Sequence, residues 1–178
     1  MVTEERLKSL IRDIPDFPAP GIVFKDITPL LADANALNMT INLMAEPYRD
    51  DGVTKVAGIE ARGFIFGVPI ARALGVGFIP VRKPGRLPHK VEQEEYELEY
   101  GTDLLEIHKD AISEGDRLLV VDDVLATGGT AAAATRLIER LGGKVVGLSV
   151  LVELGFLNGA DRLPPGLTLT KLVHYDNP

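Results

Sequence analysis

The feature of this sequence that most constrains its fold is a series of apolar runs that do not alternate with polar residues. Such runs are typical of strands buried on both faces, as they are in a parallel sheet covered by helices. Helical patterns separate several of the runs, and a strand–helix–strand connection within one sheet is right-handed. The sequence therefore predicts the α/β class, with one domain over residues 1–178 built on a mostly parallel sheet flanked by helices. The predicted strands are residues 53–59, 76–81, 118–121, 144–152 and 167–173, and the predicted helices between them are 64–74 and 130–141.

Three further patterns lie outside this series. Two of them repeat apolar residues at helical spacing and predict helices with one apolar face. The third, residues 96–100, alternates tyrosine and leucine with glutamate, which predicts a half-exposed strand. The helical patterns are Leu7, Leu10, Ile11 and Ile14, ended by Pro15, and Leu37, Ile41, Met44 and Tyr48.

The composition excludes several classes of protein. With 19 basic and 26 acidic residues the formal net charge is −7, which disfavours binding to the phosphate backbone of nucleic acids. There are no cysteines, so disulfides, thiolate zinc sites and cysteine nucleophiles are excluded. Met1–Arg6 carries two glutamates where a signal peptide needs positive charge, and no apolar stretch is long enough to span a membrane. We therefore expect a cytoplasmic protein that binds neither nucleic acid nor membrane.

The segment from Leu118 to Ala131 carries the strongest functional signal. Its apolar strand leads into Asp122 and Asp123, then a loop of small residues, and then an alanine-rich helix. In an open α/β sheet, ligands bind at the carboxyl ends of the strands, where these two acids are expected. The loop has little side-chain bulk, so its backbone N–H groups can surround a phosphate at the start of the helix. The loop residues are Ala126, Thr127, Gly128, Gly129 and Thr130.

Carboxylates for hydroxyl groups and amides for a phosphate together predict a site for ribose 5-phosphate. At Gly128, a side chain would either clash with that phosphate or demand a backbone geometry that only glycine reaches at low cost. The alternative is structural: Thr127 or Thr130 caps the helix, and the two acids are solvated. The segment is not a P-loop, because the lysine that should follow the second glycine is missing.

This strand–loop–helix segment resembles the phosphoribosyl pyrophosphate (PRPP) signature of the type I phosphoribosyltransferases. Further segments narrow the resemblance to the adenine phosphoribosyltransferases and extend it over most of the chain. Residues 158–162 depart from that family's pattern, and we assign them no functional role. The matching segments are 16–30, similar to the purine-site motif, 58–64, similar to the pyrophosphate loop, and 82–88 with 96–101, similar to the mobile catalytic loop.

The resemblance implies transfer of the phosphoribosyl group from PRPP to adenine, which yields AMP and pyrophosphate. It also implies a homodimer, a purine-site segment (1–34) that forms a small hood, a mobile loop (84–101), and Mg²⁺ held mainly by PRPP. Two alternatives remain open: a different base (hypoxanthine, xanthine, guanine or orotate), or a regulatory protein that senses PRPP.

Roles for individual residues follow from the same resemblance. Arg62 also has a physical reason, because its planar fork of donors suits pyrophosphate, although a surface ion pair with Glu60 is the alternative. Sequence periodicity alone does not distinguish Glu99 from Glu97. The implied roles are catalysis for Glu99 and Tyr100; pyrophosphate binding for Glu60, Ala61, Arg62, Arg82 and Lys83; ribose binding for Asp122 and Asp123; and adenine binding for the backbone of Val23 and Lys25 and the side chains of Phe24 and Leu154.

Overall fold

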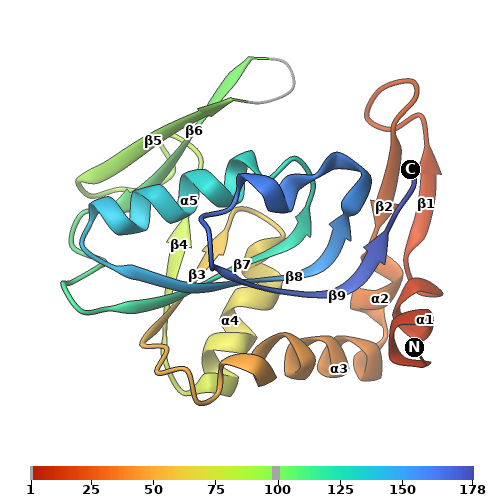
Figure 1. Cartoon of the computed structure of the whole chain (residues 1–178), viewed down its shortest axis with the longest axis horizontal. Coiled ribbons are helices and arrows are strands. Elements are labelled where there is room, and N and C mark those ends of the chain that lie inside the picture. Colours follow the sequence, from red (N-terminus) through yellow and green to blue (C-terminus); the bar gives the residue numbers. More distant parts are fainter. Residues whose placement is uncertain (1, 98–100) are drawn as a thin grey trace.

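The computed structural model describes residues 2–97 and 101–178 of the chain, with strands in the centre and helices on both sides (Figure 1). Five of the described strands form one sheet in the order β4-β3-β7-β8-β9, and every pairing in it is parallel. The predicted α/β class with a parallel sheet is therefore confirmed. The strands are β3 (Lys55–Ile59), β4 (Gly77–Val81), β7 (Arg117–Leu125), β8 (Lys144–Leu154) and β9 (Thr168–Tyr175).

The strand order reverses direction between β3 and β7. The chain moves from β3 outward to β4 on one side, and from β7 outward to β8 and β9 on the other. At such a switch point the connections leave the carboxyl ends in opposite directions, which opens a crevice between the two strands. The topology therefore places a ligand site next to Asp122 and Asp123 on β7.

Helices cover both faces of the sheet. On one face, α3 (Ala34–Ala45) and α4 (Gly63–Leu74) share a buried apolar cluster with the sheet, in which Met44, Phe66 and Leu119 are fully buried. On the other face, α5 (Gly129–Arg140) packs through small alanines and through Leu137 against Val120. The unalternated apolar runs are explained by this burial on both sides.

The N-terminal segment differs from its prediction. The helix α1 (Val2–Lys8) ends before Ile14, which lies in the strand β1 (Arg12–Pro15) and pairs with Phe24 of β2 (Val23–Asp26). The prediction of one helix up to Pro15 was wrong because the residue before a proline is biased toward extended backbone, and pairing with β2 stabilises that conformation. A short helix, α2 (Thr28–Ala32), follows and completes the hood.

A second antiparallel hairpin projects from the sheet and packs on α5 (Figure 1). It consists of β5 (Val91–Glu97) and β6 (Thr102–His108), and the sequence analysis missed β6. Of the predicted strand over 96–100, residues 96 and 97 form the end of β5, and residues 98–100 lie outside the described part. The hairpin contacts α5 through charge as well, because the carboxylate of Glu94 forms ion pairs with Arg136 and Arg140.

No helix in residues 2–97 and 101–178 combines the length and apolar character needed to cross a lipid bilayer.

Candidate functional site

A cleft of about 410 Å³ lies at the carboxyl ends of β3 and β7. The hood forms one wall, and the turn between β3 and α4 forms another. Twelve of the predicted site residues line this cleft, so segments separated by more than 100 residues meet in one place. They are Val23, Phe24, Lys25, Glu60, Ala61, Arg62, Lys83, Asp122, Asp123, Ala126, Thr130 and Leu154.

The predicted phosphate loop continues from this cleft into a smaller cavity of about 70 Å³, which Thr127 and Gly128 help to line. Gly128 is the N-cap residue of α5, with a left-handed φ of 78°, and no side chain caps the helix. The alternative in which Thr127 or Thr130 caps α5 is therefore wrong. The first-turn amides of a helix are suited to an anion, as the phosphate prediction requires.

Gly128 is also restricted by a neighbour that the sequence analysis left without a role. A Cβ at Gly128 would lie 2.1 Å from the carbonyl oxygen of Gly159, and a Cβ at Gly159 would lie 2.1 Å from that of Ala126. Protein backbone, and not only a phosphate, therefore excludes a side chain at Gly128. Residues 158–162, which depart from the family pattern, support the loop by this close contact.

The two acids lie inside β7 and not after it, because the strand continues to Leu125. The side chain of Asp123 is almost fully buried, and its Oδ2 lies 2.8 Å from Nε of Arg62. The N–H of Arg62 is not aligned with this oxygen, which has no hydrogen-bond partner among the described residues. The contact is thus an ion pair without an aligned hydrogen bond, and Asp123 keeps the capacity to accept one.

Both acids are electrostatically unusual. Burial, and next the neighbouring Asp123 carboxylate, raise the pKa of Asp122 well above its ordinary value. Burial also raises the pKa of Asp123, although the Arg62 guanidinium opposes this shift. Perturbed carboxylates of this kind gather at functional sites, where they serve a ligand at a cost in stability.

The cationic end of the cleft differs in detail from expectation. Glu60 does not pair with Arg62. Its Oε2 instead accepts hydrogen bonds from Nε of Arg82 at 3.0 Å and from the N–H of Lys83 at 2.9 Å. Burial opposes the charge of Glu60, but these donors lower its pKa. Arg82 is not among the residues that line the cleft, so its predicted contact with pyrophosphate stays a prediction.

The hood forms the end of the cleft that the sequence analysis assigned to the base. Among the described strands, β2 pairs with β1 alone, so one edge of β2 is left without a strand partner. Val23 and Lys25 are two positions apart, so their backbone groups face the same edge of β2, and Phe24 adds an aromatic ring to the cleft wall. The Lys25 side chain is 3% exposed and forms an ion pair with Asp13, which fits a backbone role at this position.

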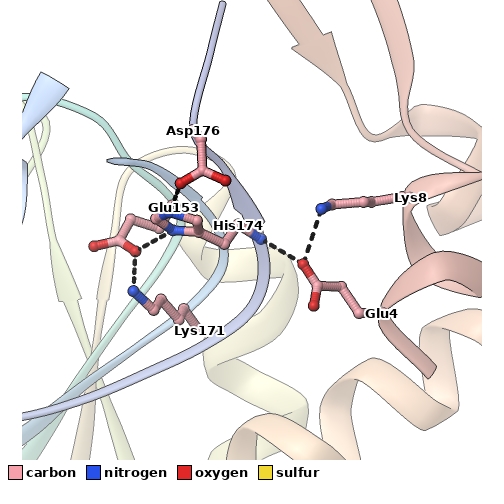
Figure 2. Close-up of polar contacts among 6 residues, drawn as sticks. All are labelled: Glu4, Lys8, Glu153, Lys171, His174 and Asp176. Atoms are coloured by element: carbon pink, nitrogen blue, oxygen red, sulfur yellow. Dashed lines mark hydrogen bonds and ion pairs between the residues drawn. The ribbon is translucent and has the colours of Figure 1, made fainter. Parts of the chain in front are cut away.

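Charged contacts attach the hood to the edge strand β9, as Figure 2 shows. Oε1 of Glu4 in α1 accepts a hydrogen bond from the N–H of His174 at 3.1 Å and forms an ion pair with Lys8. The ammonium of Lys25 lies 4.3 Å from the centre of the Tyr175 ring. Because Leu154 of β8 pairs with Tyr175, these contacts hold the two walls of the base end together.

The His174 imidazole links β8 and β9 beside this wall. Its Nδ1 lies 2.6 Å from Oε2 of the buried Glu153, and its Nε2 lies 3.0 Å from Asp176 (Figure 2). Lys171 also binds Glu153. The sequence analysis missed this cluster, since its residues form no motif and come together only through strand pairing.

The predicted catalytic residues Glu99 and Tyr100 lie outside the described residues, so their position relative to the cleft stays a prediction.

The raised pKa of Asp122 predicts that this residue destabilises the folded protein at neutral pH. When the pKa of a carboxyl is higher in the folded state than in the unfolded state, the protein loses stability as the pH rises from the ordinary pKa near 4 through the raised pKa. Asp122→Asn keeps an oxygen for the N–H of Asp123 and removes the charge. At pH 7 we expect the free energy of unfolding of this variant to exceed that of the wild type by about 1 kcal/mol or more. This gain should disappear in acid.

Urea unfolding at pH 7 and pH 3.5 measures this difference, and activity should fall in the same variant. Asp50→Asn, in an exposed turn, is the matched control and should leave the stability unchanged. An Asp122→Asn protein less stable than the wild type at pH 7 would contradict the prediction.

Comparison with known proteins agrees with the geometry of the cleft. The family described as "Phosphoribosyl transferase domain" matches residues 28–168. The adenine phosphoribosyltransferase of Myxococcus xanthus is 59% identical over 88% of this chain and 85% of its own, and that of Clostridium perfringens is 58% identical over 96% and 98%. The crystal structure of the Rhodothermus marinus adenine phosphoribosyltransferase superposes with a TM-score of 0.94 at 51% identity, covering 98% of this chain and 99% of its own. The chain therefore belongs to the phosphoribosyltransferase family.

Proposed function

We propose that this protein transfers the 5-phosphoribosyl group of PRPP to N9 of adenine, with AMP and pyrophosphate as products, and so serves purine salvage. One observation carries the proposal: a single cleft joins two carboxylates, a phosphate loop, a cationic end and an aromatic base end. A similar structure from Saccharomyces cerevisiae, 38% identical with a TM-score of 0.90 over 96% of this chain and 98% of its own, is described as complexed with adenine and an imino-altritol bisphosphate. A purine base and a phosphorylated sugar correspond to the aromatic end and the phosphate-loop end of this cleft.

The chemistry is displacement at the anomeric carbon of ribose, with positive charge developing on the sugar ring. Asp122 and Asp123 accept hydrogen bonds from the ribose hydroxyls and lie near that charge, which they stabilise. The loop 126–130 holds the 5-phosphate through its backbone amides and through the Thr127 and Thr130 hydroxyls. The leaving pyrophosphate gains negative charge, and the Arg62 and Lys83 cations at the other end of the cleft oppose it.

Mg²⁺ fits this site as a companion of the substrate. Within residues 2–97 and 101–178, no three side chains of the metal-binding types cluster into a cage. Mg²⁺ commonly keeps several waters and binds one or two carboxylates together with substrate phosphates. The carboxylates of Asp122 and Asp123 would supply that small donor set; Oδ2 of Asp123 is ion-paired with Arg62 but has no hydrogen-bond partner among the described residues. When bound, the ion neutralises charge on the leaving pyrophosphate.

The base end supports adenine over the other purines and orotate. The relatives from Myxococcus xanthus, Pectobacterium carotovorum and Clostridium perfringens, which are 59%, 55% and 58% identical to this chain, are named for adenine. Backbone groups of Val23 and Lys25 can distinguish an exocyclic amine on the base from a carbonyl. The amine donates a hydrogen bond and needs a backbone C=O, whereas the carbonyl accepts one and needs a backbone N–H. A role as a PRPP sensor has no observation in its favour. The cytoplasmic location stays a prediction from the sequence.

The first test is the reaction itself. The purified protein should form AMP from adenine and PRPP in the presence of Mg²⁺, and it should lose this activity in excess chelator. Hypoxanthine, xanthine, guanine and orotate, assayed under the same conditions, should be poor acceptors. Full activity in chelator would refute the metal requirement, and faster turnover of another base would identify a different acceptor.

The second test concerns Glu99, which we propose to handle the N7 proton of adenine when the segment 84–101 closes. An interaction made mainly in the transition state lowers kcat when it is removed and leaves KM almost unchanged. Glu99→Gln should therefore reduce kcat by roughly 100-fold, the contribution of one general acid–base group. Glu97→Gln is the matched control. Equal small losses in the two variants would show that Glu99 has no special role.

We also propose that the protein forms a homodimer, with α4 at the interface. Ile65 and Val68 lie three residues apart on this helix and are 40% and 51% exposed, which is unusual for large apolar side chains next to a functional cleft. Val68→Glu should shift the protein toward monomer in sedimentation velocity, because an unpaired charge in an apolar interface is costly. An unchanged sedimentation coefficient would exclude this face of α4 from the interface.

A further inference from the structure

Lys83 reaches the cleft from a backbone that is firmly held. It follows β4 by two residues, and its N–H donates to Oε2 of Glu60. Glu60 is bound in turn by both Nε and Nη2 of Arg82. The backbone position of Lys83 is thus fixed from inside the sheet, whereas its long side chain still has four rotatable bonds.

The Lys83 ammonium is held by the hairpin β5–β6. Its Nζ lies 2.7 Å from the hydroxyl of Tyr96 and also donates to Oδ2 of Asp103. Tyr96 and Asp103 face each other across the hairpin, and the Tyr96 hydroxyl donates to the same carboxylate oxygen at 3.1 Å. The Tyr96 side chain is 4% exposed, so this arrangement is built into the packed base of the hairpin.

The number of donors on Lys83 shows what these contacts leave available. An ammonium has three N–H donors, and Tyr96 and Asp103 use two of them. No other group among the described residues accepts a hydrogen bond from this ammonium, so the third donor remains for a ligand in the cleft that Lys83 lines. A lysine that is already held loses less conformational entropy when it binds an anion than a lysine that moves freely.

The charges at this contact are consistent with such a role. Partial burial disfavours the ammonium, but the hydrogen bonds with Asp103 and Tyr96 raise the pKa of Lys83. Burial likewise opposes the charge of Asp103, and Lys83 lowers its pKa. Both groups therefore stay ionised at neutral pH.

We propose that Asp103 and Tyr96 are positioning residues that hold the Lys83 ammonium at the cleft, ready for the pyrophosphate group of PRPP. This inference rests on the proposed function of the cleft. Neither residue needs to touch the substrate, because each acts through Lys83.

A purely neutralising role for Asp103 would have the opposite effect. If the carboxylate only cancelled the charge of Lys83, its removal would strengthen the binding of pyrophosphate. If it positions the ammonium, its removal weakens that binding. The sign of the change therefore separates the two roles.

Titration calorimetry with pyrophosphate and Mg²⁺ as the probe measures this sign directly. Asp103→Asn should weaken pyrophosphate binding about tenfold and raise the KM for PRPP by a similar factor, as for loss of one charge-assisted hydrogen bond. Tyr96→Phe should weaken it by about two- to fivefold. The affinity for AMP, which has no pyrophosphate group, should stay unchanged in both variants and reports that the cleft is intact.

Two controls complete the test. Glu92→Gln removes another hairpin carboxylate that is paired with a lysine, Lys109, away from the cleft, and it should leave pyrophosphate binding unchanged. In a Lys83→Ala background, Asp103→Asn should have no further effect, since a residue that acts through Lys83 has nothing left to position.

Unchanged or tighter pyrophosphate binding in Asp103→Asn would overturn the proposal, as would an equal loss of AMP affinity. Failure of the wild-type protein to convert adenine and PRPP to AMP would instead refute the proposed function. The binding measurements do not depend on turnover, so the two failures are distinguishable.

Discussion

Two adjacent carboxylates, Asp122 and Asp123, lie at the carboxyl end of the central strand β7, and their charge determines what surrounds them. Burial raises the pKa of both carboxyls, the Asp123 carboxylate raises that of Asp122 further, and the fold is destabilised as a result. Arg62 compensates in part, through an ion pair that lacks an aligned hydrogen bond. In the proposed function, two ribose hydroxyls donate hydrogen bonds to these acids, so part of this cost would be recovered when the substrate binds.

The shape around these acids depends on close contacts between backbone segments. A Cβ at Gly63, where α4 begins, would lie 2.7 Å from the carbonyl oxygen of Val121, so only glycine lets this helix start so close to β7. Gly128 and Gly159 show the same requirement at the phosphate loop. The proposed ribose and phosphate subsites therefore lie on closely packed backbone, which is a suitable basis for a precise site.

The sequence was sufficient for the sheet and for the segments that meet in the cleft, because both depend on local patterns. Unalternated apolar runs identify buried strands, and the acids, loop and helix of residues 118–131 form one continuous segment. The strand β6 was missed because Asp103 and Glu106 interrupt its apolar residues. The helix predicted up to Pro15 was wrong because pairing with β2 overrides the helical spacing of Ile14.

The missed contacts share a different cause. Glu4 and His174 are 170 positions apart, and Glu60 and Arg82 are 22 apart, so no motif contains either pair. The sequence did suggest a partner for Glu60, namely Arg62, since both lie in the same short turn. The structure assigns Arg82 to Glu60 and Asp123 to Arg62 instead, because the parallel pairing of β3 with β4 and β7 brings those side chains together.

The cleft thus combines parts that are held in different ways. The end proposed for ribose and phosphate is built on β7 and α5, whose apolar residues lie in the core. The other two ends depend on the hood and on the hairpin β5–β6, which add charged contacts to the apolar residues that they bury in the core. Glu4 and Lys25 fasten the hood to β9, while Lys83 and Arg140 bind the hairpin β5–β6. Partly exposed ion pairs such as Lys83–Asp103 and Arg140–Glu94 contribute little free energy each. Burial of apolar residues therefore holds each segment in place, and the charged contacts orient the side chains that reach the cleft.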